Sequence, residues 1–491
     1  MRTRFVGRAM AAFFLLLPFL PAQYAGSTPV DEARKEGFAD IDEQACKGWL
    51  EVLAGPAMEG RGTGTKGYLK AAKWIAARLK SFGLEPAGEQ GSYFQWVRLV
   101  RFLPNQQASK LAVGGWSRKG GDGLVFESCE GKAEGEAVVI RGRGRDLALQ
   151  DPESVRGKVV ILVVPLRDYF RSPLRKQLKE ASPAAILRVV GRAAQRRGMG
   201  RYQLASAVQM GAKLEEGVAK KLLKKLELPA KLATKSKDAG LQIHPSKKVV
   251  HLTVKATKEE IKSPNVVARL EGSDPELRDE VVICGAHLDH LGKRGNTIYP
   301  GADDDGSGST ALLALARAMK KNATRPRRSI VFLWVCGEEM GLYGSKWYVE
   351  NPLFPIEKTV CELQMDMVGR NEEKRNERPE DNIQTIHLVG SKKLSMDLHE
   401  VVLEENRHVG FEFEYDEEGV WNRSDHYNFA EKGIPIIFLF SGFHPDYHRP
   451  TDTVDKINFT KISNTARLMY LVAWRAANRI ERIRHDGELS K

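Results

Sequence analysis

From residue 262 onward, apolar segments of strand length alternate with segments of helical periodicity, and this alternation limits the fold more than any other feature. The expected elements, in chain order, are strands at Val266–Leu270 and Val281–Ala286, a helix at Ser307–Lys320, strands at Ile330–Cys336 and Val360–Met365, a helix at Leu394–His408, a strand at Ile434–Phe440 and a helix at Ile462–Ile483. Alternating strands and helices form a mostly parallel sheet that helices cover on both faces. We therefore predict an α/β fold with a mixed, mostly parallel sheet sandwiched by helices.

The middle of the chain has a different character. Short β-like runs at Ala137–Ile140, Val159–Val164 and Ala184–Val190 are separated by Gly-rich and Lys/Arg-rich stretches. We predict that residues 99–260 form an inserted, β-rich α+β domain. This insertion would divide the main domain into residues 26–98, which carry a helical hairpin pattern, and residues 261–491.

The N-terminus has the layout of a secretory signal peptide. Arg2, Arg4 and Arg8 precede an apolar run from Met10 to Leu20, which is too short to span a bilayer as a helix, and small residues follow it. We expect residues 1–25 to be removed, so that the protein is secreted or periplasmic with no integral membrane span. An uncleaved membrane anchor is the alternative.

The net charge of +13 is concentrated in the predicted insert. Residues 165–225 contain 15 Lys and Arg against 4 Asp and Glu, but no RNA-binding or helix-turn-helix motif and few aromatic residues. We interpret this stretch as a cationic surface and expect no specific nucleic-acid partner. The five cysteines are odd in number and form no CxxC pair, and Cys284, Cys336 and Cys361 lie in apolar runs typical of core packing.

Ligand-type side chains follow the predicted strands. The segments are Gly285-Ala-His287-Leu-Asp289-His290, Asp303-Asp304-Asp305-Gly306-Ser-Gly308, Cys336-Gly-Glu338-Glu339, Gln364-Met-Asp366 and Asp446-Tyr447-His448. Each has an ordinary alternative when taken alone. Three adjacent aspartates occur as helix caps, two glutamates occur in solvated loops, and an aspartate at a strand end occurs as a local cap.

The ordered set of these segments is more informative than any member. In open α/β sheets, sites form at the carboxyl edge of the strands. Five nitrogen and oxygen ligands without cysteine suit two divalent ions that share a bridging carboxylate. Such a pair of ions activates water and polarises a carbonyl group.

The segments resemble those of the co-catalytic zinc exopeptidases, the family of secreted leucine aminopeptidases, aminopeptidase Y and the glutamate carboxypeptidase and transferrin-receptor group. The resemblance covers roughly residues 42–98 and 262–480. It implies two Zn²⁺ ions, a zinc-exopeptidase fold of the phosphorylase/hydrolase-like type, and these roles: His287 and Asp366 on one zinc, Glu339 and His448 on the other, Asp304 between them, Glu338 as general base, and Asp289 orienting His287 from outside the ligand set. Asp303 is the nearest competitor for the bridging position. In this family the peptide bond after the bridging aspartate is often cis, which we expect for Asp304–Asp305.

The resemblance extends to substrate contacts and to the insert. Tyr447 precedes His448, as a carbonyl-polarising tyrosine does in some aminopeptidases of the family, although a packed aromatic is the alternative. Arg423 lies in a segment that resembles the family's Arg-Ser-Asp-His motif and is expected to contact substrate. Gly157-Lys-Val-Val-Ile161 resembles a strand of the protease-associated domain that many members carry at this place.

The implied function is a secreted metallo-aminopeptidase that hydrolyses the N-terminal bond of peptide or protein substrates. Three alternatives remain open: a carboxypeptidase or dipeptidase of the same fold, a non-catalytic binding module like the receptor relatives that lost their metals, and a protein that binds a surface or nucleic acid through its basic stretch. The sequence does not indicate an oligomeric state.

Overall fold

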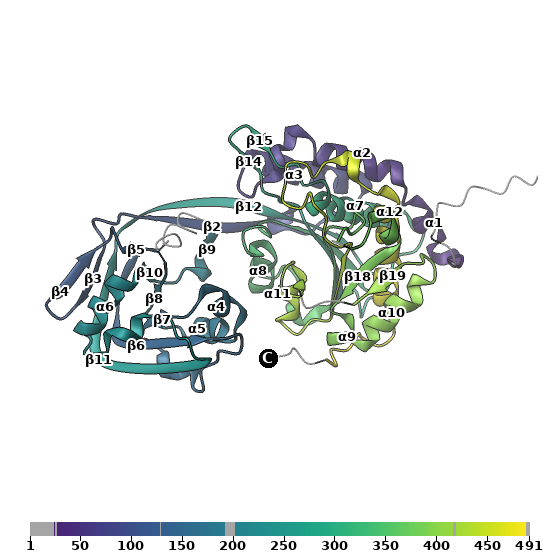
Figure 1. Ribbon diagram of the computed structural model, residues 1–491. Helices are drawn as coiled ribbons and strands as arrows, with labels where there is room; N and C mark the ends of the chain where they lie inside the picture. The colour runs from purple at the N-terminus through teal and green to yellow at the C-terminus, as the bar shows by residue number, and fades with distance from the viewer. Residues whose placement is uncertain are drawn as a thin grey trace, which may run out of the picture.

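Two β-sheets organise the computed structural model, which describes Tyr24 and residues 27–127, 129–191, 202–374, 376–415 and 419–487 (Figure 1). The predicted signal peptide lies outside the described residues, apart from Tyr24. Among the described residues, no helix has the length and apolar character needed to cross a membrane.

The larger sheet has ten strands in the described part of the chain. Its order is β19-β18-β20-β17-β13-β16-β12-β2-β9, with β1 paired to β12. The bounds are β1 Glu85–Pro86, β2 Phe94–Pro104, β9 Gln203–Leu204, β12 Ala256–Leu270, β13 Val281–His287, β16 Ser329–Val335, β17 Thr359–Met365, β18 Thr385–Val389, β19 Glu412–Glu414 and β20 Ile436–Phe440. The central pairs β16-β13-β17-β20 are parallel, while β12 and β18 pair antiparallel on either side. The predicted mixed α/β sheet is confirmed.

The central strands are apolar on both faces because helices cover both. On one face, Cys284, Phe332 and Leu363 pack in a core with residues of α1, α2, α3, α7, α10 and α12. On the other face, Ile283 and Val331 pack in a separate core with residues of α8 and α11. Continuous apolar strands are typical of parallel sheets that are buried on both sides.

The helices of this body are α1 Glu32–Asp40, α2 Glu43–Leu53, α3 Lys66–Phe82, α7 Gly308–Lys321, α8 Tyr343–Glu350, α9 Ser391–Leu394, α10 Met396–Asn406, α11 His426–Ala430 and α12 Phe459–Asn478. The helix expected at Leu394–His408 is divided, because Ser395 is extended and its side chain caps α10 by accepting from Leu398 N. The closing helix begins three residues earlier than expected because Asn458 caps it at Lys461 N.

The second sheet has eight strands among the described residues. They are β3 Lys110–Val113, β4 Trp116–Lys119, β5 Leu124–Phe126, β6 Gly131–Arg143, β7 Val159–Val163, β8 Ala185–Val189, β10 Gly211–Leu214 and β11 Gly240–Val254. Helix α6 (Glu216–Lys225) packs on one face, and α4 (Leu166–Arg171) and α5 (Leu174–Ala181) pack on the other. This body therefore has cores of its own.

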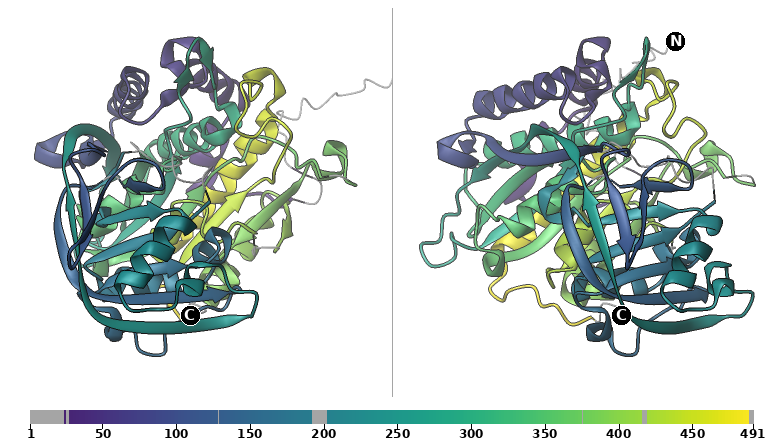
Figure 2. Two further views of the ribbon diagram at one scale, coloured as in Figure 1. Left: turned by 60° about the vertical axis from the view of Figure 1, so that its left-hand side comes forward. Right: turned by 90° about the vertical axis from the view of Figure 1, so that its left-hand side faces the viewer.

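Strands β2 and β12 join the two bodies as one long antiparallel ribbon (Figures 1 and 2). Pairing continues from Phe94 opposite Val266 to Pro104 opposite Ala256. The domain boundaries that the sequence suggests, at 98/99 and 260/261, fall inside this ribbon, where Leu99 and Ile261 are direct partners. All five cysteines are free and buried.

Candidate metal centre

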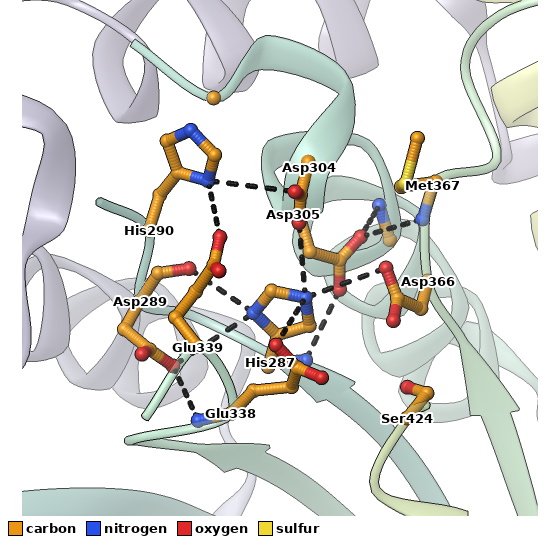
Figure 3. A network of polar contacts seen from close by, with 12 residues as sticks. His287, Asp289, His290, Asp304, Asp305, Glu338, Glu339, Asp366, Met367 and Ser424 are labelled. Atoms are coloured by element: carbon orange, nitrogen blue, oxygen red, sulfur yellow. Dashed lines mark hydrogen bonds and ion pairs between the residues drawn. The ribbon is translucent and has the colours of Figure 1, made fainter. Parts of the chain in front are cut away.

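The predicted ligand segments converge at the carboxyl edge of the central strands (Figure 3). His287 ends β13, Glu338 and Glu339 follow β16, and Asp366 follows β17. Asp304 lies in the irregular turn Ala302–Ser307 that leads into α7. Parallel strands bring their carboxyl ends to one edge, so residues about 80 positions apart become neighbours.

One cluster at this edge joins His287, Asp304 and Asp366. His287 Nε2 lies 3.3 Å from Asp304 Oδ1 and 3.3 Å from Asp366 Oδ1. The three side chains are buried, and their ligand atoms are close enough together to hold one metal ion. Burial alone would lower the pKa of His287, but the carboxylates around it, led by that of Asp366, outweigh burial and raise the pKa well above its usual value.

A second cluster lies on the other side of Asp304. His448 Nε2 is 3.1 Å from Asp304 Oδ2 and 3.0 Å from Glu339 Oε2. His290 Nδ1 is 2.8 Å from Glu339 Oε1, and His290, Asp304 and Glu339 also have their ligand atoms close enough for one ion. Burial lowers the pKa of His448, but its bonds to Asp304 and Glu339 raise it to about 9.

Asp304 is the residue that the two clusters share. Its Oδ1 faces His287 and its Oδ2 faces His448, as a bridging carboxylate requires. The peptide bond between Asp304 and Asp305 is cis, so that expectation from the sequence is confirmed.

The two neighbouring aspartates serve the backbone instead. Asp305 Oδ1 accepts from Gly308 N at 2.9 Å and Met367 N at 3.1 Å, and its Oδ2 accepts from His287 N at 3.1 Å. It thus caps α7 and ties that helix to β13 and to the segment after β17. A Cβ on Gly308 would meet Asp305 Oδ1 at 2.4 Å, so only glycine allows this approach.

Asp303, which competes with Asp304 for the bridging position in the sequence, also points away from the clusters. Its Oδ1 accepts from Gly369 N at 2.7 Å, and its Oδ2 lies 3.2 Å from His444 Nε2. Both of its oxygens are therefore occupied elsewhere, and Asp304 is the member of the run that faces both histidine clusters.

The buried polar atoms at this edge suit metal ions. Six atoms of the two clusters have no hydrogen-bond partner in the described part of the chain: His287 Nε2, both ring nitrogens of His290, Asp304 Oδ2, Glu339 Oε1 and Asp366 Oδ1. An unsatisfied buried polar group costs about 1–3 kcal/mol, so six at one place indicate a ligand. Imidazole nitrogens and carboxylate oxygens without thiolates fit zinc.

Glu338 lies beside the first cluster. Its Oε2 is 4.0 Å from His287 Nε2, and its backbone N–H donates to Asp289 Oδ1 at 3.2 Å. Burial, and then the nearby carboxylates, raise the pKa of Glu338 well above its usual value. A carboxylate whose pKa is raised is better suited to accept and return a proton.

Asp289 is arranged differently from the expected orienting carboxylate. His287 Nδ1 is 3.1 Å from the backbone carbonyl of Asp289, whereas the carboxylate is 3.8 Å away. The carboxylate accepts instead from Thr63 Oγ1 at 2.8 Å and from the N–H of Glu338. Asp289 therefore holds His287 through its main chain and the Glu338 loop through its side chain.

A pocket opens beside the clusters. Its floor is formed by Asp304, Glu338 and Asp366, and its walls are Met367, Val420, Arg423, Phe438, Phe440, Phe443 and Tyr447. Arg423 donates to Tyr447 Oη at 3.1 Å and stacks on the Phe443 ring. The structure thus brings both predicted substrate-contacting residues to the wall of this pocket.

The sequence analysis missed two supporting residues. His290 follows Asp289 directly, so its position beside a ligand segment was the available signal. Arg61 is fully buried, and its side chain donates to four backbone carbonyls: Leu53, Leu288, Pro300 and Gly301. No sequence pattern marks a residue whose partners are main-chain atoms. The carbonyl of Arg61 accepts from His290 N at 3.2 Å, which links it to the second cluster.

Residues 265–473 match the family model described as Peptidase family M28. This segment is a peptidase family M28 domain. All the clustered ligand-type residues lie within it, from His287 to His448.

Curated relatives of this M28 domain include peptidases. The chain is 29% identical over 235 residues to leupeptin-inactivating enzyme 1 of Streptomyces exfoliatus, covering 43% of this chain and 48% of that protein. It is 28% identical over 225 residues to a probable leucine aminopeptidase of Arthroderma otae, covering 44% and 58%. The chain therefore spans about half the length of these relatives.

Among solved structures, an aminopeptidase from Aneurinibacillus sp. strain AM-1 is similar over 93% of this chain and 100% of its own, with a TM-score of 0.52 and 19% identity. This likeness covers the M28 domain and the second body together, and it supports the fold described above.

Proposed function

We propose that the chain is a zinc-dependent aminopeptidase that hydrolyses the N-terminal bond of peptides. The observation that carries the proposal is the position of Asp304 between two buried clusters, each with imidazole and carboxylate donors. His287 and Asp366 would hold one Zn²⁺ and Glu339 and His448 the other, with Asp304 shared. Zinc held there would acidify a water molecule and polarise the scissile carbonyl group.

Glu338 is the proposed general base. It lines the pocket beside the clusters, and its Oε2 lies 4.0 Å from His287 Nε2, farther than the carboxylates of Asp304 and Asp366 do. Its carboxylate takes a proton from the attacking water and returns it to the leaving amine. The backbone N–H of Glu338 donates to Asp289 Oδ1, and this bond helps to fix the loop that positions the Glu338 carboxylate.

Tyr447 and Arg423 form the wall that the scissile carbonyl would face. Burial, and then the charge of Asp304, raise the pKa of Tyr447, so the phenol keeps its proton and remains a donor at neutral pH. We propose that this hydroxyl stabilises negative charge that develops on the substrate oxygen. Arg423 fixes the phenol and offers its other N–H groups to substrate.

The test is Glu338→Gln. Loss of a general base costs about 10²–10⁴-fold in rate, so kcat on leucyl-4-nitroanilide should fall by about that factor while two zinc ions remain bound. A variant within about threefold of wild type would refute the role of Glu338. Glu377→Gln, an exposed substitution outside the pocket, serves as the matched control.

A carboxypeptidase or dipeptidase of the same fold is the second candidate. Arg423 in the pocket wall favours it, since a guanidinium suits the terminal carboxylate of a short substrate. Peptides with free and with acetylated N-termini separate the two candidates: an aminopeptidase cleaves only the free form, and a carboxypeptidase cleaves both.

Two further assignments complete the proposal. Residues 1–25 would be an export signal, which makes the enzyme secreted or periplasmic. Residues 99–260 would be a protease-associated-like domain inserted in the peptidase domain. The separate cores of the second body and its entry through the β2/β12 ribbon support this division.

A further inference from the structure

His290 is the clustered residue to which neither the family pattern nor the comparisons assign a role. It follows β13, and only 1% of the residue is exposed to solvent. Neither ring nitrogen has a hydrogen-bond partner. A buried imidazole with two unsatisfied nitrogens is costly unless something else binds it.

The ring is aimed at the second cluster. Its Nδ1 lies 2.8 Å from Glu339 Oε1 and 3.7 Å from Asp304 Oδ2 (Figure 3). At 2.8 Å the contact with Glu339 has the length of an ion pair, which the imidazole forms when it is protonated. Two donor atoms that converge in this way are typical of ligands around a common ion.

The two oxygens of Glu339 divide between two histidines. Oε1 faces His290 and Oε2 faces His448, while Asp304 Oδ2 faces both rings. The first cluster, in contrast, contains a single imidazole, that of His287.

The backbone is shaped to hold His290 in place. Gly301 has φ +56°, and a Cβ there would meet His290 Cγ at 2.4 Å. The ring therefore packs directly on a glycine of the segment that carries Asp304. The N–H of His290 donates to the carbonyl of the buried Arg61.

We infer that His290 is a ligand of the second metal position through Nδ1. The inference rests on the proposed function, because it requires a metal ion there. It gives the second position four protein ligands, namely His290, Asp304, Glu339 and His448. Four protein ligands are typical of zinc sites that retain their ion firmly, whereas sites with three leave a position open. The second ion is thus the more tightly held of the two.

The test uses the full chain and zinc alone. Apoprotein is equilibrated with a series of buffered free Zn²⁺ concentrations, and bound zinc per chain is measured by mass spectrometry. Wild type should fill two positions in two steps. In His290→Ala the tighter step should weaken by at least about tenfold, since even groups that only support a ligand contribute about 10–100-fold to affinity. The weaker step should be unchanged.

Two controls accompany this variant. His287→Ala should weaken the other step. His399→Ala removes a buried histidine on α10 that bonds to Ser391, and it should leave both steps unchanged. If wild type binds two ions and His290→Ala binds them with the same two affinities, the role of His290 is refuted and the proposed function stands. If wild type binds fewer than two ions, the proposed function itself fails.

A measurement on wild type alone avoids any effect of the variant on folding. In crystals loaded with zinc, anomalous scattering locates each ion. His290 Nδ1 should lie about 2.0–2.1 Å from the second ion. A distance above about 3 Å, with the ring paired to Glu339 as an ion pair, would overturn the inference.

Discussion

Two groups of histidine and carboxylate in the M28 domain can be compared: the strand-end centre, made of the first and second clusters together, and a separate group that we call the Glu372 group. In the strand-end centre, His287 and His290 face Asp304, Asp366 and Glu339, and none of these carboxylates forms an ion pair with Lys or Arg among the described residues. In the Glu372 group, His387 lies between Glu372 and the partly exposed Glu414, and Lys374 Nζ is 2.8 Å from Glu372 and 3.8 Å from Glu414.

Spacing alone does not separate the two, because both sets have ligand atoms close enough for a metal ion. The difference lies in the counter-charge. His387 and Lys374 lower the pKa of Glu372 despite its burial, so the Glu372 group contains the positive charge that offsets its carboxylates. The strand-end centre instead has six buried nitrogen and oxygen atoms without a hydrogen-bond partner. The feature that distinguishes a metal centre here is therefore the absence of a Lys or Arg that neutralises its carboxylates among the described residues.

The largest effect on zinc binding and activity is expected for a substitution of Asp304. Asp304→Asn removes the charge that both ion positions share, so zinc content should fall below two per chain. The value of kcat/KM should drop by at least about 10³-fold, equivalent to about 4 kcal/mol of transition-state stabilisation. Glu372→Gln is the matched control, with two zinc ions and unchanged kcat/KM. If Glu372→Gln loses zinc instead, the Glu372 group binds metal and the comparison is wrong.

Arg61 is a buried cation near the strand-end centre, but its N–H groups donate to backbone carbonyls and form no ion pair with the carboxylates of that centre among the described residues. Arg61→Met removes the guanidinium donor from four carbonyls, of which only that of Gly301 keeps another donor, Gly306 N, and each buried carbonyl left without one costs about 1–3 kcal/mol. We expect the free energy of unfolding in urea to fall by about 3 kcal/mol or more. A loss below about 1 kcal/mol would show that water or another group replaces the guanidinium easily.

Glu372→Gln should also lower stability, since Lys374 and His387 lose their shared carboxylate. Hydrogen bonds to charged groups contribute about 1.5–3 kcal/mol, so the free energy of urea unfolding should be about 2 kcal/mol lower in the variant than in wild type. This difference should be the same with and without a chelator. If a chelator abolishes the difference between the variant and wild type, the stability of this cluster depends on metal after all.

The smallest effect concerns Lys461, a fully buried side chain that donates to the carbonyls of Asn382 and Thr385 beside the Glu372 group. Burial lowers its pKa from 10.5 to about 7, although the charges of Asp303, Glu372 and Glu414 oppose this. Between pH 7 and 10.5 the unfolded chain binds more protons at Lys461 than the folded chain does, so stability rises with pH.

Lys461→Met removes this dependence. Relative to the variant, wild type should gain about 1 kcal/mol between pH 7 and pH 8, measured as the free energy of unfolding. Parallel curves for the two proteins would mean that Lys461 remains charged in the folded state.

The sequence allowed the order of ligand segments and the choice of Asp304 to be predicted, because both follow from strand ends and from a resemblance. The separate tasks of Asp303 and Asp305 were not predictable, since their partners are N–H groups of Gly369 and Gly308. Asp289 was predicted to act through its carboxylate, whereas its carbonyl contacts His287. Contacts made by the main chain leave no trace in residue type.

The fold was predictable where apolar runs alternate with helical ones, and less so at the domain boundaries. Strands β2 and β12 pair without interruption across both predicted boundaries, so the change in amino-acid composition there does not coincide with the end of a strand. His290 was passed over because a histidine after Asp289 matches no ligand pattern, although its burial and its aim toward Glu339 are evident in three dimensions.

The β2/β12 ribbon has a topological consequence. Because Pro104 pairs with Ala256, the second body lies within the loop of a single β-hairpin, and the short strand β9 of that loop returns to pair with β2 at the edge of the larger sheet. The entropy of closing a loop grows only slowly with loop length, so a long insertion between β2 and β12 costs little. The chain can therefore gain, exchange or lose material at the tip of this hairpin without shifting any strand that carries a ligand.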